Sequence, residues 1–412
     1  MSHFFNIINH RWFGWFICVI ILVGMLTSKF LLGMGTVLFG AAALVNPKVG
    51  QHFKNLFNQK GLMAVWSVFF MCLLAGLWSE DTAYWLDRMR MKMPFLALPF
   101  AFASLQNVNT KNYYRLLNFF FWAVALLSLL ALVRYGLDYE NINQDYGAGK
   151  VIPTTVHHIR FSLMVVLAIA VGYFLSGKKY FEKFSWEPRL QLLVTIFLIV
   201  FLHILAVRSG LLAFYGLMFY LVINEVVKRK KIGWALLIGG VLTLGAVLSY
   251  RQIPTLKKKI DYTFYSIDLF QKKESIRELS DSRRLGSILA GWEIFRTHPW
   301  LGVGLGDIKN ETNAYLAAHY PDLTDLGLMP HNQYLFILAA CGIFGLLWFL
   351  AATLYPFFYK HAWRNQLFVS MQIIFILSFL VEHTVETQVG TAFVVFFLCL
   401  AIRHQDFLEG EG

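Results

Sequence analysis

The sequence predicts an all-α polytopic membrane protein with about twelve transmembrane helices and one long, partly helical loop outside the membrane. Of its 412 residues, 58% are hydrophobic and only 15% are charged. A soluble protein of this size cannot bury that much apolar surface. Runs long enough to cross about 30 Å of hydrocarbon recur near residues 13–28, 30–45, 62–78, 93–105, 114–136, 160–176, 190–207, 210–227, 232–250, 334–357, 367–383 and 389–402. The fourth run is short and the first two are nearly continuous, so eleven spans are an alternative.

One long polar stretch divides the chain. Residues 1–250 hold nine predicted spans, residues 251–330 form the outer loop, and residues 331–412 hold three further spans. The first span has no small-residue cleavage site and is followed at once by the second, so we interpret it as a signal anchor. The four cysteines lie inside apolar runs, where we expect them to pack as small residues without disulfide or metal-ligand spacing.

The basic residues responsible for the net charge of +12 are distributed among the loops as the predicted topology requires. Short loops after even-numbered spans are basic, as in "NPKVGQHFKNLFNQKG" and "EVVKRKKIG", whereas loops such as "SEDTAYWLDRMRMK" balance bases with acids. The positive-inside rule then places both termini in the cytoplasm and residues 251–330 outside. The excess charge is explained by topology and lipid headgroups, so no nucleic-acid partner is expected.

The outer loop contains two predicted helices. The stretch "TLKKKIDYTFYSIDLFQKKESIRELS" is charged and amphipathic, which is typical of a helix on a membrane surface. After it, five apolar residues at helical spacing predict a second helix, namely Leu285, Ile288, Leu289, Trp292 and Phe295. We expect Asp281 or Ser282 to cap this helix and Pro299 to end it.

The second helix begins with a candidate anion-binding arginine and is followed by a glycine-rich stretch. Arg284 lies in its first turn, beside a helix N-terminus that itself favours anions, whereas the neighbouring Arg283 faces another direction. The sequence "GVGLGD" (302–307) follows a helix and departs from G-x-G-x-x-G. It therefore predicts a glycine-rich turn rather than a nucleotide-binding loop.

Polar candidates gather where the predicted spans meet the outer face. They are Arg88, Arg90, His158, Arg160, Arg208, His331, Asn332 and Glu386. Span interiors are almost free of ionisable groups, and His203, the clearest exception, is expected to be a packed or helix-bridging residue rather than a site. Transporters place charges or broken helices near the midplane, so a polysaccharide-lipid transporter is the less favoured alternative.

Arg208 and His331 each have a plain and a functional interpretation. Arg208, in "AVRSG", either extends toward headgroups or uses its rigid fork of donors to bind phosphate. His331 and Asn332 either cap a helix, or His331 serves as a general base, because neutral imidazole accepts protons near neutral pH. We expect Arg208, Arg284 and His331 to meet in one outward-facing site.

Four stretches resemble signatures of the O-antigen ligase family. They are "AVRSGLLA", "SRRLGSILAGWEIFRTHPWLGVGLGDI", "PHNQYLFILAACGIFGLL" and "VEHTVETQVGTAFVVFF". The resemblance covers roughly residues 190–400 and implies a GT-C-like, inverting, metal-independent glycosyltransferase without cofactors. It implies a bacterial inner-membrane location with a periplasmic active site. One departure is Val207, where many relatives have Ser or Thr before the arginine.

The resemblance also implies substrates and residue roles. The donor would be an undecaprenyl-diphosphate-linked glycan, and the acceptor a lipid A–core or related glycan. Arg208 and Arg284 would bind the donor diphosphate, and His331 would activate the acceptor hydroxyl.

Other activities remain open at this point. The superfamily also contains O-antigen and exopolysaccharide polymerases and protein O-oligosaccharyltransferases. Glu80 and Asp81 would suit a metal-dependent sugar transferase, although the chain has no D-x-D motif.

Overall fold

The computed structural model describes residues 12–106, 108–147, 151–177, 186–229, 232–272 and 276–410. Most of these residues are helical and none lies in a strand, so the predicted all-α class is confirmed. The chain forms two compact units, each assembled from segments that are distant in the sequence. The predicted orientation rests on the basic loops, and parts of two of them, residues 178–185 and 230–231, lie outside the described residues.

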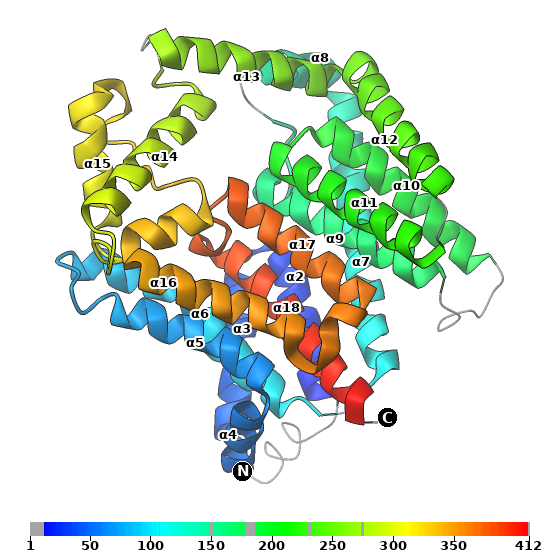
Figure 1. The fold of residues 1–412 in the computed structure, drawn as a ribbon. Helices are drawn as coiled ribbons and strands as arrows, with labels where there is room; N and C mark the ends of the chain where they lie inside the picture. Colours follow the sequence, from blue (N-terminus) through cyan, green and yellow to red (C-terminus); the bar gives the residue numbers. More distant parts are fainter. Residues whose placement is uncertain are drawn as a thin grey trace. The chain divides into compact units, whose positions relative to one another are not determined.

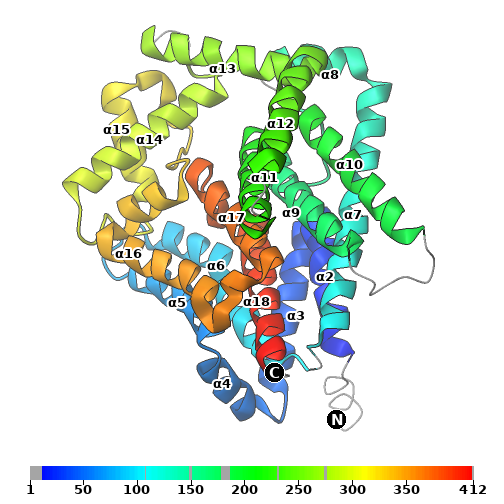
Figure 2. The ribbon, with the colours of Figure 1, turned by 45° about the vertical axis from the view of Figure 1, so that its right-hand side comes forward.

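The first unit comprises residues 1–120, 284–372 and 379–412. Its own helices are α2 (Phe13–Thr27), α3 (Lys29–Val45), α4 (Val49–Asn58), α5 (Lys60–Leu74), α6 (Thr82–Ser104), α15 (Ile308–His319), α16 (Gln333–Phe358) and α18 (Gln388–Gly410), with 3-10 helices η1 (Pro321–Leu323), η2 (Tyr359–Arg364) and η3 (Thr384–Glu386). Every residue of α18 from Val389 to Ile402 is buried, as expected for a helix that is apolar on all sides. α18 packs against α6, and α5 lies beside both α6 and α16 (Figure 1, Figure 2).

The second unit comprises residues 121–283 and 373–378. Its own helices are α8 (Tyr139–Gly147), α9 (His158–Ser176), α10 (Glu187–Leu205), α11 (Arg208–Arg229), α12 (Ile232–Gln252) and α13 (Pro254–Lys272), and α7 (Thr110–Leu137), α14 (Ser280–Thr297) and α17 (Gln366–Val381) belong partly to each unit. α9 is buried along most of its length and packs against α10 and α11. His203 of α10 lies 2.9 Å from the Tyr215 hydroxyl of α11, so it bridges two helices as predicted.

Each of the twelve apolar runs corresponds to a helix, but fewer have the dimensions of a membrane span. Among the described residues, six helices are long and apolar enough: α7, α9, α10, α11, α16 and α18. α3 and α4 make a seventh candidate that is bent by 110°. Three further apolar helices, α2, α5 and α17, have at most 17 residues, short of the roughly 20 that a perpendicular crossing needs.

Helix α16 is broken at Gly342, and the glycine-rich turn that follows α14 fills the break. Gly342 has φ 65° and ψ −167°, a conformation that is essentially restricted to glycine. The backbone N–H groups of Val303 and Gly304 donate to the carbonyls of Ala339 (3.0 Å) and Ala340 (2.9 Å), and Ile343 N–H donates to the Pro299 carbonyl (2.8 Å). The turn thereby satisfies polar backbone groups inside an apolar helix, where lipid offers no partner.

The fit between this turn and α16 requires glycine at two positions. A Cβ atom on Gly342 would lie 2.1 Å from the Trp300 carbonyl oxygen, and one on Gly302 would lie 2.4 Å from the Ala340 carbonyl carbon. Both obstacles are backbone atoms, which cannot rotate away. Gly302 also has a positive φ of 68°, so a side chain is unfavourable at either position.

We expect Gly342→Ala to lower the free energy of unfolding by about 3 kcal/mol, because the substitution combines a glycine-only conformation with a backbone clash. Thermal unfolding of the purified protein in detergent measures the effect. Gly136→Ala is the matched control, since a Cβ there meets open space. A Gly342→Ala protein with the melting temperature of the wild type would contradict this account of the break.

Candidate active site

Helix α14 carries Arg284 and confirms the helix predicted from the apolar spacing. The helix begins at Ser280, so Asp281 and Ser282 lie inside its first turn rather than at its cap, which corrects the expected cap. Part of the apolar stripe faces outward, because Leu289 is 39% exposed and Trp292 51% exposed. The buried face instead contains Ser287, Ala290 and Ile294, and the helix ends before Pro299, as predicted.

Arg284 is held by a buried carboxylate. Its Nη2 atom donates to Glu382 Oε1 at 2.6 Å. The Glu382 side chain is only 2% exposed, whereas that of Arg284 is 24% exposed. The carboxylate therefore fixes the guanidinium from the protein side and leaves part of it accessible to a ligand.

His331 contacts the same face of α14 through Ser287. The Ser287 Oγ atom lies 3.1 Å from His331 Nδ1 and accepts from the His331 backbone N–H at 3.3 Å. The Ser287 hydroxyl donates its proton to the Arg284 carbonyl at 2.8 Å, so we assign the His331 Nδ1 atom as a donor to Ser287. In this tautomer Nε2 carries the lone pair that a general base requires.

Other contacts fix the polar start of α16. Asn332 caps the helix, because its Oδ1 accepts from the Leu335 N–H at 3.0 Å, and its amide donates to the Leu380 carbonyl at 2.8 Å. Gln333 is fully buried; its amide donates to Glu386 at 2.9 Å and its Oε1 accepts from the Val385 N–H at 3.0 Å. Residues 331–333 therefore contain both the helix cap, Asn332, and the candidate base, His331.

His383 completes this cluster in the first unit. Its ring meets that of His331 edge-on, with ring centroids 4.6 Å apart. His383 and Glu382 both belong to the short connection between α17 and α18. One connection thus supports Arg284 and His331 together.

Arg208 lies in the second unit and has a carboxylate partner of its own. Its guanidinium forms a two-point ion pair with Asp281, with Nη1 2.8 Å from Oδ2, and Nη1 also donates to the Thr263 hydroxyl at 3.2 Å. The Asp281 side chain is 5% exposed and that of Arg208 is 36% exposed. The connection from α10 to α11 is short because Ala206 adopts a left-handed conformation, with φ 48°.

The secondary candidates near α6 differ in their accessibility. Glu386 is 2% exposed and forms an ion pair with Lys92, which is 1% exposed, so its carboxylate is enclosed by the protein. Arg88 pairs with Asp87 at 2.7 Å and donates to the Glu386 carbonyl at 3.3 Å. Arg90 is exposed.

The secondary candidates of α9 lie in the second unit. Arg160 lies in the first turn of α9 and is 5% exposed, so its side chain is enclosed by the protein. His158 is half-buried, and its ring stacks on that of His157 with a centroid distance of 4.3 Å. Neither residue belongs to the unit that contains His331.

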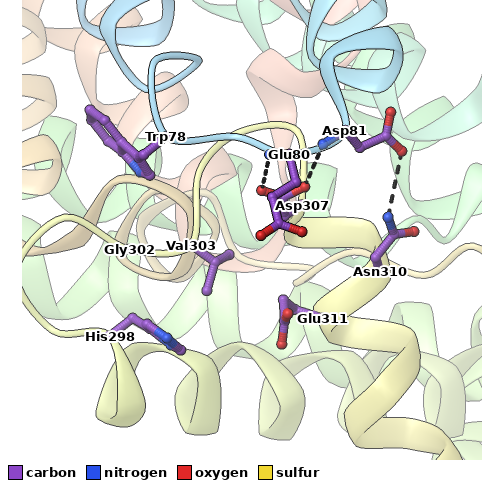
Figure 3. Close-up of a pocket in the computed structure, with 9 residues that line it drawn as sticks. All are labelled: Trp78, Glu80, Asp81, His298, Gly302, Val303, Asp307, Asn310 and Glu311. Carbon is purple, nitrogen blue, oxygen red and sulfur yellow. Dashed lines mark hydrogen bonds between the residues drawn. The ribbon is translucent and has the colours of Figure 1, made fainter.

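Glu80 and Asp81 line an acidic cavity of about 520 Å³ together with Trp78, His298, Gly302, Val303, Asp307, Asn310 and Glu311 (Figure 3). The Asp307 carboxylate accepts from the backbone N–H groups of Glu80 and Asp81, both at 2.8 Å. Asp81 in turn caps α6 by accepting from the Tyr84 N–H. Asp81 and Asp307 thus join the loop before α6 to the turn before α15.

In the described part of the chain, no group of three His, Cys, Asp or Glu side chains has the arrangement of a metal site. The cysteines are buried and unbridged, as their apolar surroundings predicted.

Sequence reasoning identified the cations and the imidazole but not all of their partners. Ser287 was not singled out, although it follows Arg284 by three residues and so shares its helix face. Lys92 was among the polar residues noted in the connection before the fourth apolar run, but its ion pair with Glu386 was not predicted. Asp281 was interpreted as a cap rather than as the partner of Arg208.

Comparison with known proteins agrees with the resemblance seen in the sequence. Residues 193–350 match the family model described as O-antigen ligase, and this range contains Arg208, Arg284 and His331. No curated protein matches the chain. Its long apolar helices are those of a multi-pass membrane protein, and over residues 193–350 the chain is similar to the O-antigen ligase family.

Proposed function

We propose that the protein is a glycan ligase of the bacterial inner membrane, with its active site facing the periplasm. It transfers a glycan from undecaprenyl diphosphate to a hydroxyl group of lipid A–core or a related glycolipid. The family match supports membrane glycan chemistry of the ligase or polymerase type. The donor, the acceptor and the orientation are our assignments.

One observation carries this proposal: helix α14 connects a diphosphate-binding candidate to a proton-accepting candidate. Arg284 and Ser287 are three residues apart and share a helix face, and Ser287 contacts His331. Glycan transfer from a lipid diphosphate needs both functions, because negative charge develops on the leaving group while the acceptor hydroxyl loses a proton.

The reaction is a single displacement. His331 Nε2 removes the proton from the acceptor hydroxyl, and the acceptor oxygen attacks the anomeric carbon of the first sugar. The bond from that carbon to the diphosphate oxygen breaks, and the electron pair leaves with undecaprenyl diphosphate. Attack opposite the leaving group inverts the anomeric configuration.

Two arginines stabilise the departing diphosphate without a metal. Guanidinium groups bind phosphate oxygens at two points, and such bonds strengthen where water is excluded. Arg284 and Arg208 are each oriented by a buried carboxylate, so little reorganisation is needed when the donor binds. We assign both guanidiniums to the donor diphosphate.

We expect His331→Ala to reduce kcat for glycan transfer by about 10²–10⁴-fold, because the acceptor loses its general base. Ser287→Ala should cause a smaller loss, since the imidazole remains but its Nδ1 atom loses its partner. Transfer by purified protein, measured with a lipid-linked oligosaccharide and lipid A–core, tests both variants. The control is His319→Ala, which removes an exposed histidine; wild-type kcat in His331→Ala would refute the assigned role.

Arg284→Lys and Arg208→Lys should each lower kcat about 10²-fold or more, because an ammonium group keeps the charge but loses the two-point fork. Arg296→Lys is the matched control on the same helix, since Arg296 is 63% exposed and pairs with Glu293. The same transfer assay reports the three rates. Equal losses in all three variants would mean that these substitutions do not probe diphosphate binding.

Deletion of the gene followed by lipopolysaccharide electrophoresis separates ligation from polymerisation. Loss of a ligase leaves lipid A–core without attached glycan, and this is the expected result. Core that carries a single repeat unit would instead identify a polymerase. Unchanged lipopolysaccharide in the deletion strain would contradict the proposed acceptor.

A further inference from the structure

Building on the proposed function, we propose that the buried ion pair between Lys92 and Glu386 positions the catalytic segment, which makes Lys92 a positioning residue for glycan transfer. Lys92 is 1% exposed, and its Nζ atom donates to the Val385 carbonyl at 2.7 Å as well as to the Glu386 carboxylate. The lysine side chain thus extends from α6 to η3, where it bonds to the backbone of Val385 and to the side chain of Glu386.

The contacts of this pair continue to His331. Glu386 Oε1 accepts from the Gln333 amide, and Gln333 Oε1 accepts from the Val385 N–H. Gln333 is two residues beyond His331 and lies in the first turn of α16. The position of η3 therefore determines where the start of α16 can lie.

The connection that contains η3 also carries the carboxylate partner of Arg284. Glu382, which pairs with Arg284, precedes Glu386 by four residues in the connection between α17 and α18. Arg88, one helical turn before Lys92, adds a hydrogen bond to the Glu386 carbonyl. Lys92 is thus connected through η3 to both the candidate base and the arginine support.

Stability alone does not explain a buried pair of this kind. Removing two charges from water costs several kcal/mol per ion, and apolar residues of similar volume often serve stability as well or better. Glu386 Oε2 is enclosed and has no hydrogen-bond partner among the described residues, so the pair is not optimally satisfied. A role in fixing geometry accounts for its presence.

The test compares Lys92→Met with the double variant Lys92→Met/Glu386→Leu. The single variant leaves an unpaired buried carboxylate and should lower the melting temperature. The double variant removes both charges and should restore the melting temperature, but its kcat should stay about 10²-fold below wild type, because misplacement of a catalytic group by about 1 Å has an effect of that size. The KM for the donor should change little in comparison.

Lys272→Met is the matched control, because Lys272 pairs with Asp268 but is 56% exposed; it should keep wild-type kcat and melting temperature. Recovery of both melting temperature and kcat in the double variant would overturn the proposal, since the pair would then be structural only. Such a result would leave the proposed function intact as long as His331→Ala remained inactive beside an active wild type.

Hydrogen exchange provides a readout that does not depend on transfer activity. Peptides covering residues 331–336 and 383–387 should exchange at least about tenfold faster in the double variant, because the link through Gln333 is lost. The interior of α18 should exchange at the wild-type rate. Unchanged exchange in both peptides would overturn the positioning role even if the proposed substrates proved wrong.

Discussion

The contact between Ser287 and His331 is the interaction on which the candidate active site depends. It joins α14, which carries Arg284, to the first turn of α16. The serine donates to the backbone of its own helix and accepts from the His331 backbone N–H, and on this basis we assign Nδ1 of the ring as the donor to Ser287. These contacts give the His331 side chain, at the start of an apolar helix, a defined orientation.

A second regularity is electrostatic. Each of the cations Arg284, Arg208 and Lys92 pairs with a carboxylate whose side chain is more buried than that of the cation, by only 1% against 0% for Lys92 and Glu386. Where the cation is partly exposed, the pair presents an oriented guanidinium. Where the cation is buried, as in Lys92, the pair joins segments instead. The same chemical pairing thus has two uses, which exposure distinguishes.

Local patterns in the sequence were sufficient for the helices and for the candidate cations and base. Apolar runs and helical spacing are local properties, and "AVRSG" and "PHNQ" stand out from their neighbours. The partners of these residues could not be predicted, because the contacts join Ser287 to His331 across 44 residues and Lys92 to Glu386 across 294. The outward position of Leu289 and Trp292 does not follow from the spacing, because in a membrane protein an apolar stripe can face lipid as readily as a core.

The break in α16 has a consequence for how the chain is made. Without the turn at residues 299–304, the carbonyls of Ala339 and Ala340 lose the donors that now serve them, and each unmet group costs several kcal/mol in hydrocarbon. The turn is synthesised before α16, so its docking partner emerges from the ribosome only afterwards. Biogenesis of this helix is therefore coupled to the preceding segment, which must dock against Ala339 and Ala340 before α16 can integrate correctly.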